Sequence, residues 1–164
     1  MATYKDFRIL NVGSGIKKIK DAWNIDKLKD VEPDEVIDIT EGPLPYEDNW
    51  FEEVVADYVL TQIANKYDLM KVLNEAWRIL KPDGIFRLKV SNANFPEDAF
   101  RDLMDDRRFT PTSFDHLNVK HYRWFAFKYG FKPWHKISVE PERVTRLSVK
   151  MTPYKNNYNK KTPI

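Results

Sequence analysis

The chain has 164 residues, of which 14% are aromatic, with 27 Lys and Arg against 25 Asp and Glu. A chain of this size buries about 70% of its unfolded surface, so its length and aromatic content exclude an intrinsically disordered protein. The near balance of charge excludes a global basic field for nucleic acid, and the absence of cysteine excludes disulfides, thiolate metal sites and cysteine nucleophiles.

The distribution of apolar residues does not suggest a membrane protein. The first residues lack the apolar stretch of a secretory signal, and no apolar run approaches the ~20 residues that a membrane helix needs. We therefore expect a cytoplasmic protein with no membrane partner.

The predicted elements alternate along most of the chain. Apolar, β-branched runs bounded by Gly, Pro, Asn and Asp predict strands at residues 7–12, 23–25, 35–39, 51–56 and 84–90. Helical spacing of apolar residues predicts helices at residues 67–80, 96–104 and 121–129. Alternation over residues 134–140 and 143–152, joined at Pro141-Glu142, predicts a closing β-hairpin.

This order of elements predicts an α/β fold with a mostly parallel sheet that is covered on both faces. The closing hairpin adds an antiparallel strand, as in mixed sheets. In such sheets ligands bind outside the carboxyl ends of the strands, where the strand order reverses. Gly13, Asp26, Asp38 and Asp57 all fall at predicted carboxyl ends, so we expect them on one rim.

Gly13 and Gly15 follow the first apolar run, and Asp26 ends the second. Glycines at that position let the backbone turn sharply and approach a ligand, and the acid can accept both hydroxyls of a ribose. In dinucleotide-binding proteins the acid lies about 20 residues beyond the glycines, whereas Asp26 lies 13 residues after Gly13. The intervening residues 16–22 are too few for a full crossover helix. Because a pyrophosphate depends on that helix, the spacing favours a phosphate-free sulfonium cofactor over NAD or FAD.

Several strings together resemble the class I S-adenosylmethionine-dependent methyltransferases, in particular a small branch with a short first crossover. The resemblance covers about residues 7–92. The strings are Leu10-Asn-Val-Gly-Ser-Gly15, Asn24-Ile-Asp26, Asp38-Ile-Thr, Leu44-Pro-Tyr-Glu-Asp-Asn49, Phe51-Glu-Glu-Val-Val-Ala-Asp-Tyr-Val-Leu60 and Leu73-Asn-Glu-Ala-Trp-Arg-Ile-Leu-Lys-Pro-Asp-Gly84.

The resemblance implies a Rossmann-like, doubly wound sheet of seven strands that binds S-adenosylmethionine and releases S-adenosylhomocysteine. It implies that Gly13 and Gly15 line the methionine part and that Asp26 binds the ribose. Asp38 and Ile39 would lie beside the adenine. The expected cofactor residues are Asn11, Gly13, Ser14, Gly15, Asp26, Asp38, Ile39, Asp57 and Tyr58.

The chain also departs from the family pattern. Asn11 stands where many members have an acid, Lys17 takes the place of a third glycine, and Thr61-Gln62 replaces a Glu-His pair. No Asn/Asp-Pro-Pro-aromatic motif follows the fourth predicted strand, which argues against the amino group of a nucleobase as acceptor.

Methyl transfer from a sulfonium needs alignment more than it needs acid–base groups, although a hydroxyl acceptor requires a general base. His116, next to Asp115, is the candidate base, and Tyr46 and Tyr58 are further candidates for contact with substrate. The histidines match no standard metal-ligand spacing, so we expect no metal.

Residues 1–153 are expected to form a single methyltransferase-like domain, followed by a flexible basic tail at residues 154–164. The function expected first is methylation of a small molecule or glycan. One alternative is a degenerate cofactor-binding or interaction module. The other is a protein or nucleic-acid methyltransferase that uses the tail. A homodimer is compatible with the sequence.

Overall fold

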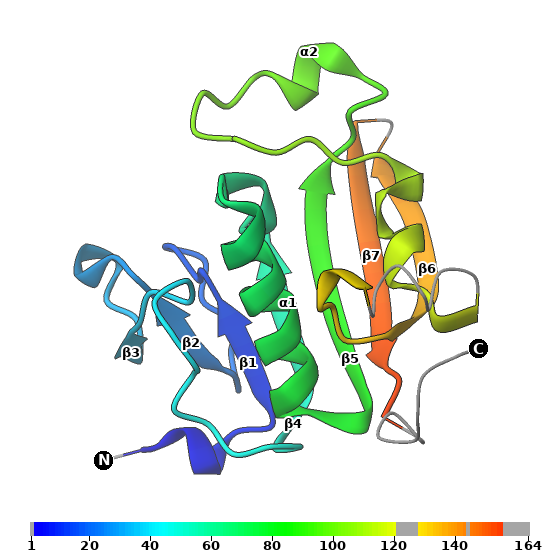
Figure 1. Ribbon diagram of the computed structural model, residues 1–164. Coiled ribbons are helices and arrows are strands. Elements are labelled where there is room, and N and C mark those ends of the chain that lie inside the picture. The colour runs from blue at the N-terminus through cyan, green and yellow to red at the C-terminus, as the bar shows by residue number, and fades with distance from the viewer. Residues whose placement is uncertain (1, 121–127, 144, 156–164) are drawn as a thin grey trace.

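The structure, a computed structural model, describes residues 2–120, 128–143 and 145–155 (Figure 1). In these residues a seven-stranded sheet has the order β3-β2-β1-β4-β5-β7-β6. The strands are β1 (Ile9–Val12), β2 (Trp23–Asp26), β3 (Glu35–Val36), β4 (Phe51–Asp57), β5 (Leu80–Ser91), β6 (Trp134–Arg143) and β7 (Arg146–Pro153).

The first five strands pair in parallel, and β7 lies antiparallel between β5 and β6. This topology confirms the predicted mostly parallel sheet with a C-terminal antiparallel hairpin. The strand order reverses between β1 and β4, so ligands are expected beyond the carboxyl ends of these two strands.

Two of the three predicted helices fall within the described residues. The helix α1 (Lys66–Ile79) agrees with the prediction to within a residue. It is capped by Asn65, whose side chain accepts a hydrogen bond from the Tyr67 backbone N–H. The second helix, α2 (Pro96–Ala99), has four residues and ends five residues before its predicted end. Most of the third predicted helix, residues 121–127, lies outside the described residues. Short 3-10 turns complete the set: η1 (Tyr4–Asp6), η2 (Lys29–Val31), η3 (Leu60–Gln62) and η4 (Pro111–Leu117).

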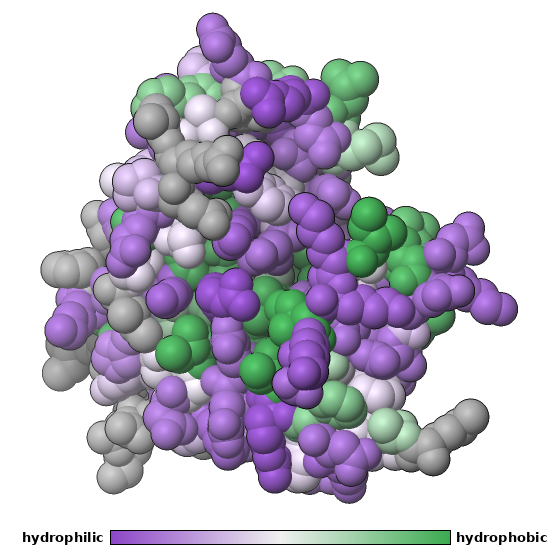
Figure 2. Space-filling model, turned by 180° about the vertical axis from the view of Figure 1, so that it is seen from behind, coloured by the Kyte–Doolittle hydropathy of each residue, from purple (hydrophilic) through white to green (hydrophobic). Residues whose placement is uncertain are grey.

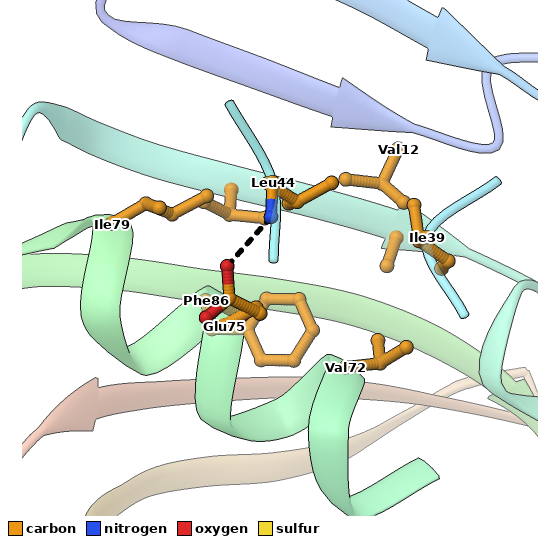
Figure 3. A pocket seen from close by; sticks show the side chains of 10 residues that line it. Val12, Ile39, Leu44, Val72, Glu75, Ile79 and Phe86 are labelled. Carbon is orange, nitrogen blue, oxygen red and sulfur yellow. Dashed lines mark hydrogen bonds between the residues drawn. The ribbon is translucent and has the colours of Figure 1, made fainter. Parts of the chain in front are cut away.

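The core lies on one face of the sheet. Alternate residues of β4 and β5, among them Val54, Phe86 and Leu88, are almost fully buried and pack with the apolar stripe of α1. Figure 1 shows α1 and η4 in front of this same face. Figure 3 shows Val72 and Ile79 of α1 close to Val12 and Phe86 of the sheet, around a small void.

The opposite face is polar, which differs from the expectation of a sheet covered on both sides. On this face the acids Glu53 and Asp57 of β4 lie near the bases Arg87 and Lys89 of β5, and Arg87 Nε lies 2.7 Å from Glu53 Oε1 across the two strands. Lys89 lies opposite Asp57 in the same way, with Nζ 3.8 Å from Asp57 Oδ2. In Figure 2, which views this side, hydrophilic side chains cover most of the face, with separate apolar areas between them. A parallel sheet covered on both faces carries continuous apolar strands, so the alternation explains why β5 presents charged side chains on this face.

A single arginine joins two of the strings on which the family resemblance depends. The guanidinium of Arg78, near the end of α1, donates to the carbonyl oxygens of Leu44 (2.9 Å) and Tyr46 (2.7 Å). It also binds both carboxylate oxygens of Glu75, and Glu75 accepts the Leu44 N–H at 2.8 Å, as Figure 3 shows. The two strings therefore form one clamp that fixes the loop before β4 on α1.

Candidate functional site

A cleft of about 500 Å³ lies beyond the carboxyl ends of β1, β2 and β4. Its volume is typical of small-molecule sites. Most of the residues expected to bind the cofactor line it: Gly13, Gly15, Asp26, Asp38, Ile39, Asp57 and Tyr58. The structure therefore brings together side chains that are up to 45 residues apart in the sequence.

The glycine turn after β1 requires glycine for two separate reasons. Gly13 and Gly15 have φ of +60° and +51°, in the left-handed region that favours glycine. A Cβ on Gly13 would in addition lie 2.5 Å from Cγ2 of Val59, in the segment after β4. The missing side chain thus lets the two loops that form the cleft approach each other.

Asp26 is held in place by backbone groups on both sides. Its Oδ2 accepts the Gly15 N–H at 2.8 Å, and its Oδ1 accepts the Leu28 N–H at 2.9 Å. The residue is 9% exposed and lines the cleft. A carboxylate offers about four acceptor positions, so two remain for a ligand. The two hydroxyls of a ribose could donate hydrogen bonds to these two positions.

Asp38 and Ile39 form a mixed polar and apolar wall. Asp38 Oδ1 accepts the backbone N–H of Thr40 at 2.9 Å and the Thr40 hydroxyl at 2.7 Å. Burial alone would raise the pKa of Asp38, but the two bonds from Thr40 and the charge of Lys27 outweigh it and lower the pKa. Asp38 is therefore a carboxylate at neutral pH that can accept a hydrogen bond, and Ile39 adds an apolar surface beside it in the cleft.

Tyr58 follows β4 and carries backbone strain at the edge of the cleft. Its φ of +61° is uncommon for a residue with a side chain, and such strain gathers at functional sites. The Arg146 guanidinium carbon lies 5.8 Å from the centre of the Tyr58 ring. Tyr58 thus links the cleft to the start of β7.

The structure places Asn11 and Ser14 outside the cleft lining. Asn11 Nδ2 donates to Asn24 Oδ1 at 2.9 Å inside the sheet. Asn24 also accepts the Ile19 N–H and donates to the Ala22 carbonyl. These bonds fix the short connection between β1 and β2. Asn11 therefore has a structural role: it helps to hold a crossover that is too short to form a helix. Ser14 is buried and its backbone N–H donates to Ile25.

The other two candidate substrate residues do not line this cleft. Tyr46 lies at the amino ends of the strands, where its hydroxyl donates to Glu35 at 2.9 Å and its ring packs on Phe51. Burial and the bond to Glu35 raise the pKa of Tyr46 far above its usual range, so the phenol stays protonated and structural. His116 lies on η4 and lines a second, apolar cavity of about 380 Å³.

The far wall of the cleft comes from residues that the sequence interpretation did not assign. It is formed by Val59, Gln62, Ile63, Ala64, Asn65 and Asp68, between β4 and the first turn of α1. The only feature of the sequence that pointed to this wall was Thr61-Gln62, which replaces the Glu-His pair of the family pattern. The buried Thr61 donates its hydroxyl to the Tyr58 carbonyl and so supports that wall from inside.

The strand order, the glycine turn and the acid at the end of β2 define an open α/β domain with a cleft at its switch point, where such folds bind nucleotide-type cofactors. The family model described as "Methyltransferase domain" matches residues 19–88. Over these residues the chain is similar to methyltransferase domains.

Solved structures share the fold at low sequence identity. A S-adenosylmethionine-dependent methyltransferase from Clostridium acetobutylicum is 11% identical, with a TM-score of 0.62 over 88% of this chain and 83% of its own. One from Archaeoglobus fulgidus is 10% identical, with a TM-score of 0.63 over 91% and 87%. The methyltransferase CalH, solved with S-adenosylhomocysteine, is 14% identical, with a TM-score of 0.63 over 92% of this chain and 52% of its own. No curated protein sequence matches the chain.

No helix within the described residues is long and apolar enough to cross a membrane.

Proposed function

We propose that the cleft binds S-adenosylmethionine and that the chain transfers its methyl group to a small molecule, a class that includes sugars. The observation that carries this proposal is the Asp26 carboxylate, which two backbone N–H groups hold in the cleft with acceptor positions to spare. A ribose diol matches that arrangement.

In this proposal, different residues of the cleft bind different parts of the cofactor. The bare backbone at Gly13 and Gly15 admits the methionine part close to the chain. The Asp38 carboxylate accepts a hydrogen bond from the adenine amino group, and Ile39 packs on the adenine ring. The glycine turn and Asp57 with Tyr58 enclose the end of the cleft nearest β1 and β4, where we place the methyl group.

When bound, the sulfonium supplies a methyl carbon that an acceptor lone pair attacks while the carbon–sulfur pair stays on sulfur. The chain has to align the acceptor and exclude water. A hydroxyl acceptor also requires a general base, and His116 lines the second cavity and not the cofactor cleft, so we assign it no contact with the methyl group.

Calorimetric titration with S-adenosylmethionine, S-adenosylhomocysteine and NAD tests the cofactor. We expect Kd values near ~1 μM for the first two, about −8 kcal/mol, and no heat with NAD, because no crossover helix is present among the described residues to bind a pyrophosphate. Absence of binding at millimolar S-adenosylhomocysteine would contradict the proposal and favour a degenerate module.

A further inference from the structure

The far wall of the cofactor cleft is built largely from irregular backbone. Gln62, Ile63, Ala64 and Asn65 all line the cleft, and residues 63–65 lie between η3 and α1, outside both helices. Backbone of this kind has no regular ladder of hydrogen bonds, so its position depends on the individual partners that its N–H and C=O groups find. The groups that bind this stretch therefore decide where the wall stands.

One arginine from a distant segment binds the wall at three carbonyl groups. The guanidinium of Arg107 donates from Nε to the Ile63 carbonyl oxygen and from Nη2 to the Ala64 carbonyl oxygen, the second at 2.8 Å. The backbone N–H of Arg107 donates to the Thr61 carbonyl oxygen, also at 2.8 Å. Hydrogen bonds from a charged donor are stronger than those between neutral groups, so these contacts fasten the wall to the segment that follows β5.

The wall is also connected to the opposite side of the cleft. Thr61 is fully buried and donates its hydroxyl to the Tyr58 carbonyl oxygen. Val59, in the same turn, lies so close to the glycine turn that a Cβ on Gly13 would be 2.5 Å from its Cγ2. Closely packed groups transmit a displacement to their neighbours. A shift of residues 61–64 would therefore alter the end of the cleft where we place the methyl group.

Arg107 itself lies outside the cleft. It is not among the residues of the described chain that line the cleft. Figure 1 shows its segment, between α2 and η4, passing over the end of α1 that begins at Lys66. Any effect of Arg107 on a bound cofactor must therefore act through the wall.

We infer that Arg107 is a positioning residue for the cofactor: it holds the far wall in the position in which S-adenosylmethionine binds, without touching the cofactor. This inference rests on the proposed function. Without the guanidinium, the Ile63 and Ala64 carbonyl groups bind water instead, and the wall occupies its binding position for a smaller fraction of the time. The apparent affinity for a ligand falls by that same fraction.

The neighbouring arginine provides a matched control. The guanidinium carbon of Arg108 lies 4.5 Å from the centre of the Phe100 ring, and its Nη1 donates to the carbonyl oxygens of Asp105 and Arg107. These contacts stay within its own segment. Arg107→Met removes the guanidinium and keeps an apolar stem, Arg107→Lys keeps a cation that can donate to a carbonyl group, and Arg108→Met removes the same group one position along the chain.

Two measurements on the full chain test the inference. In calorimetric titration with S-adenosylhomocysteine, Arg107→Met should raise the Kd about tenfold, Arg107→Lys should fall between it and the wild type, and Arg108→Met should stay within about twofold of the wild type. In hydrogen exchange followed by mass spectrometry, the amides of Gln62 and Ile63, which donate to carbonyl groups of the same turn, should exchange faster in Arg107→Met than in Arg108→Met.

All comparisons are made at a temperature at which circular dichroism shows each variant to be folded, and Arg107→Lys replaces Arg107→Met if the latter does not fold. A Kd in the Arg107 variant equal to that of the wild type would overturn the inference, as would an equal loss in Arg108→Met. A wild type that does not bind S-adenosylhomocysteine would refute the proposed function instead. The exchange rates would then still report whether Arg107 holds the wall, so the two failures are distinguishable.

Discussion

Removal of the Asp26 carboxylate should weaken cofactor binding by a predictable amount. In Asp26→Ala the ribose loses its acceptor, and the backbone N–H groups of Gly15 and Leu28 lose theirs. Hydrogen bonds to charged groups contribute about 1.5–3 kcal/mol. Water replaces part of the loss in an open cleft, so we expect a total near ~1.5–3 kcal/mol, or roughly 10- to 150-fold in the Kd for S-adenosylhomocysteine.

Isothermal titration calorimetry measures this change directly, and Asp26→Asn adds a second point. The amide keeps the size of the side chain and one acceptor oxygen, so its effect should be smaller than that of alanine. Asp83→Ala is the control, because Asp83 is exposed at the opposite end of the sheet. If Asp26→Ala binds as tightly as the Asp83 control, the assignment of Asp26 to the ribose is refuted.

Three further predictions concern groups that shape the domain. Arg78→Met should lower the free energy of unfolding by about 2–4 kcal/mol, because it leaves Glu75 and the loop carbonyls without their hydrogen-bond donor. Urea denaturation measures this change, and a loss below ~0.5 kcal/mol would show that the clamp is dispensable. Gly13→Ala should lower cofactor affinity more than Gly15→Ala, because only Gly13 meets a side chain, Val59, at 2.5 Å; equal effects in calorimetry would contradict this reason. Burial lowers the pKa of Lys155 to about 8 from an ordinary value of 10.5, so the unfolded chain binds more protons between these pH values, and unfolding free energy should rise with pH across that window. Lys155→Met should flatten that rise in melts at pH 8 and pH 10, and an identical slope in both proteins would disprove it.

Much of the fold was predictable because its boundaries are local. The glycine, proline and Asn-Asp breaks around β1, β4 and β5 act within a few residues, and the stripe on α1 repeats at helical spacing. The polar second face was also encoded locally, in the alternation Phe86-Arg-Leu-Lys-Val90. We expected two covered faces because strand–helix alternation usually implies them, and side-chain alternation is the stronger signal here.

The tail shows how a composition argument can miss a contact. Its basic residues suggested a flexible segment, and residues 156–164 lie outside the described residues. Lys155, however, donates to the Asn49 side chain and to the carbonyl oxygens of Arg78 and Leu80. These bonds attach the start of the tail to the carbonyl end of α1. No local pattern in the sequence identifies a partner that is 75 residues away.

The sequence by itself determined the strand–glycine–acid pattern, and with it the strand ends at which a cofactor cleft forms. Those features depend on backbone conformation and short-range spacing, which local residue types specify. Tertiary structure alone decided that Asn11 holds the crossover and that Tyr46 is locked to Glu35. It also decided that His116 lines an apolar cavity beyond the cofactor cleft. These outcomes depend on which distant elements pack together, because a side chain's environment is set by the whole fold and not by its neighbours along the chain.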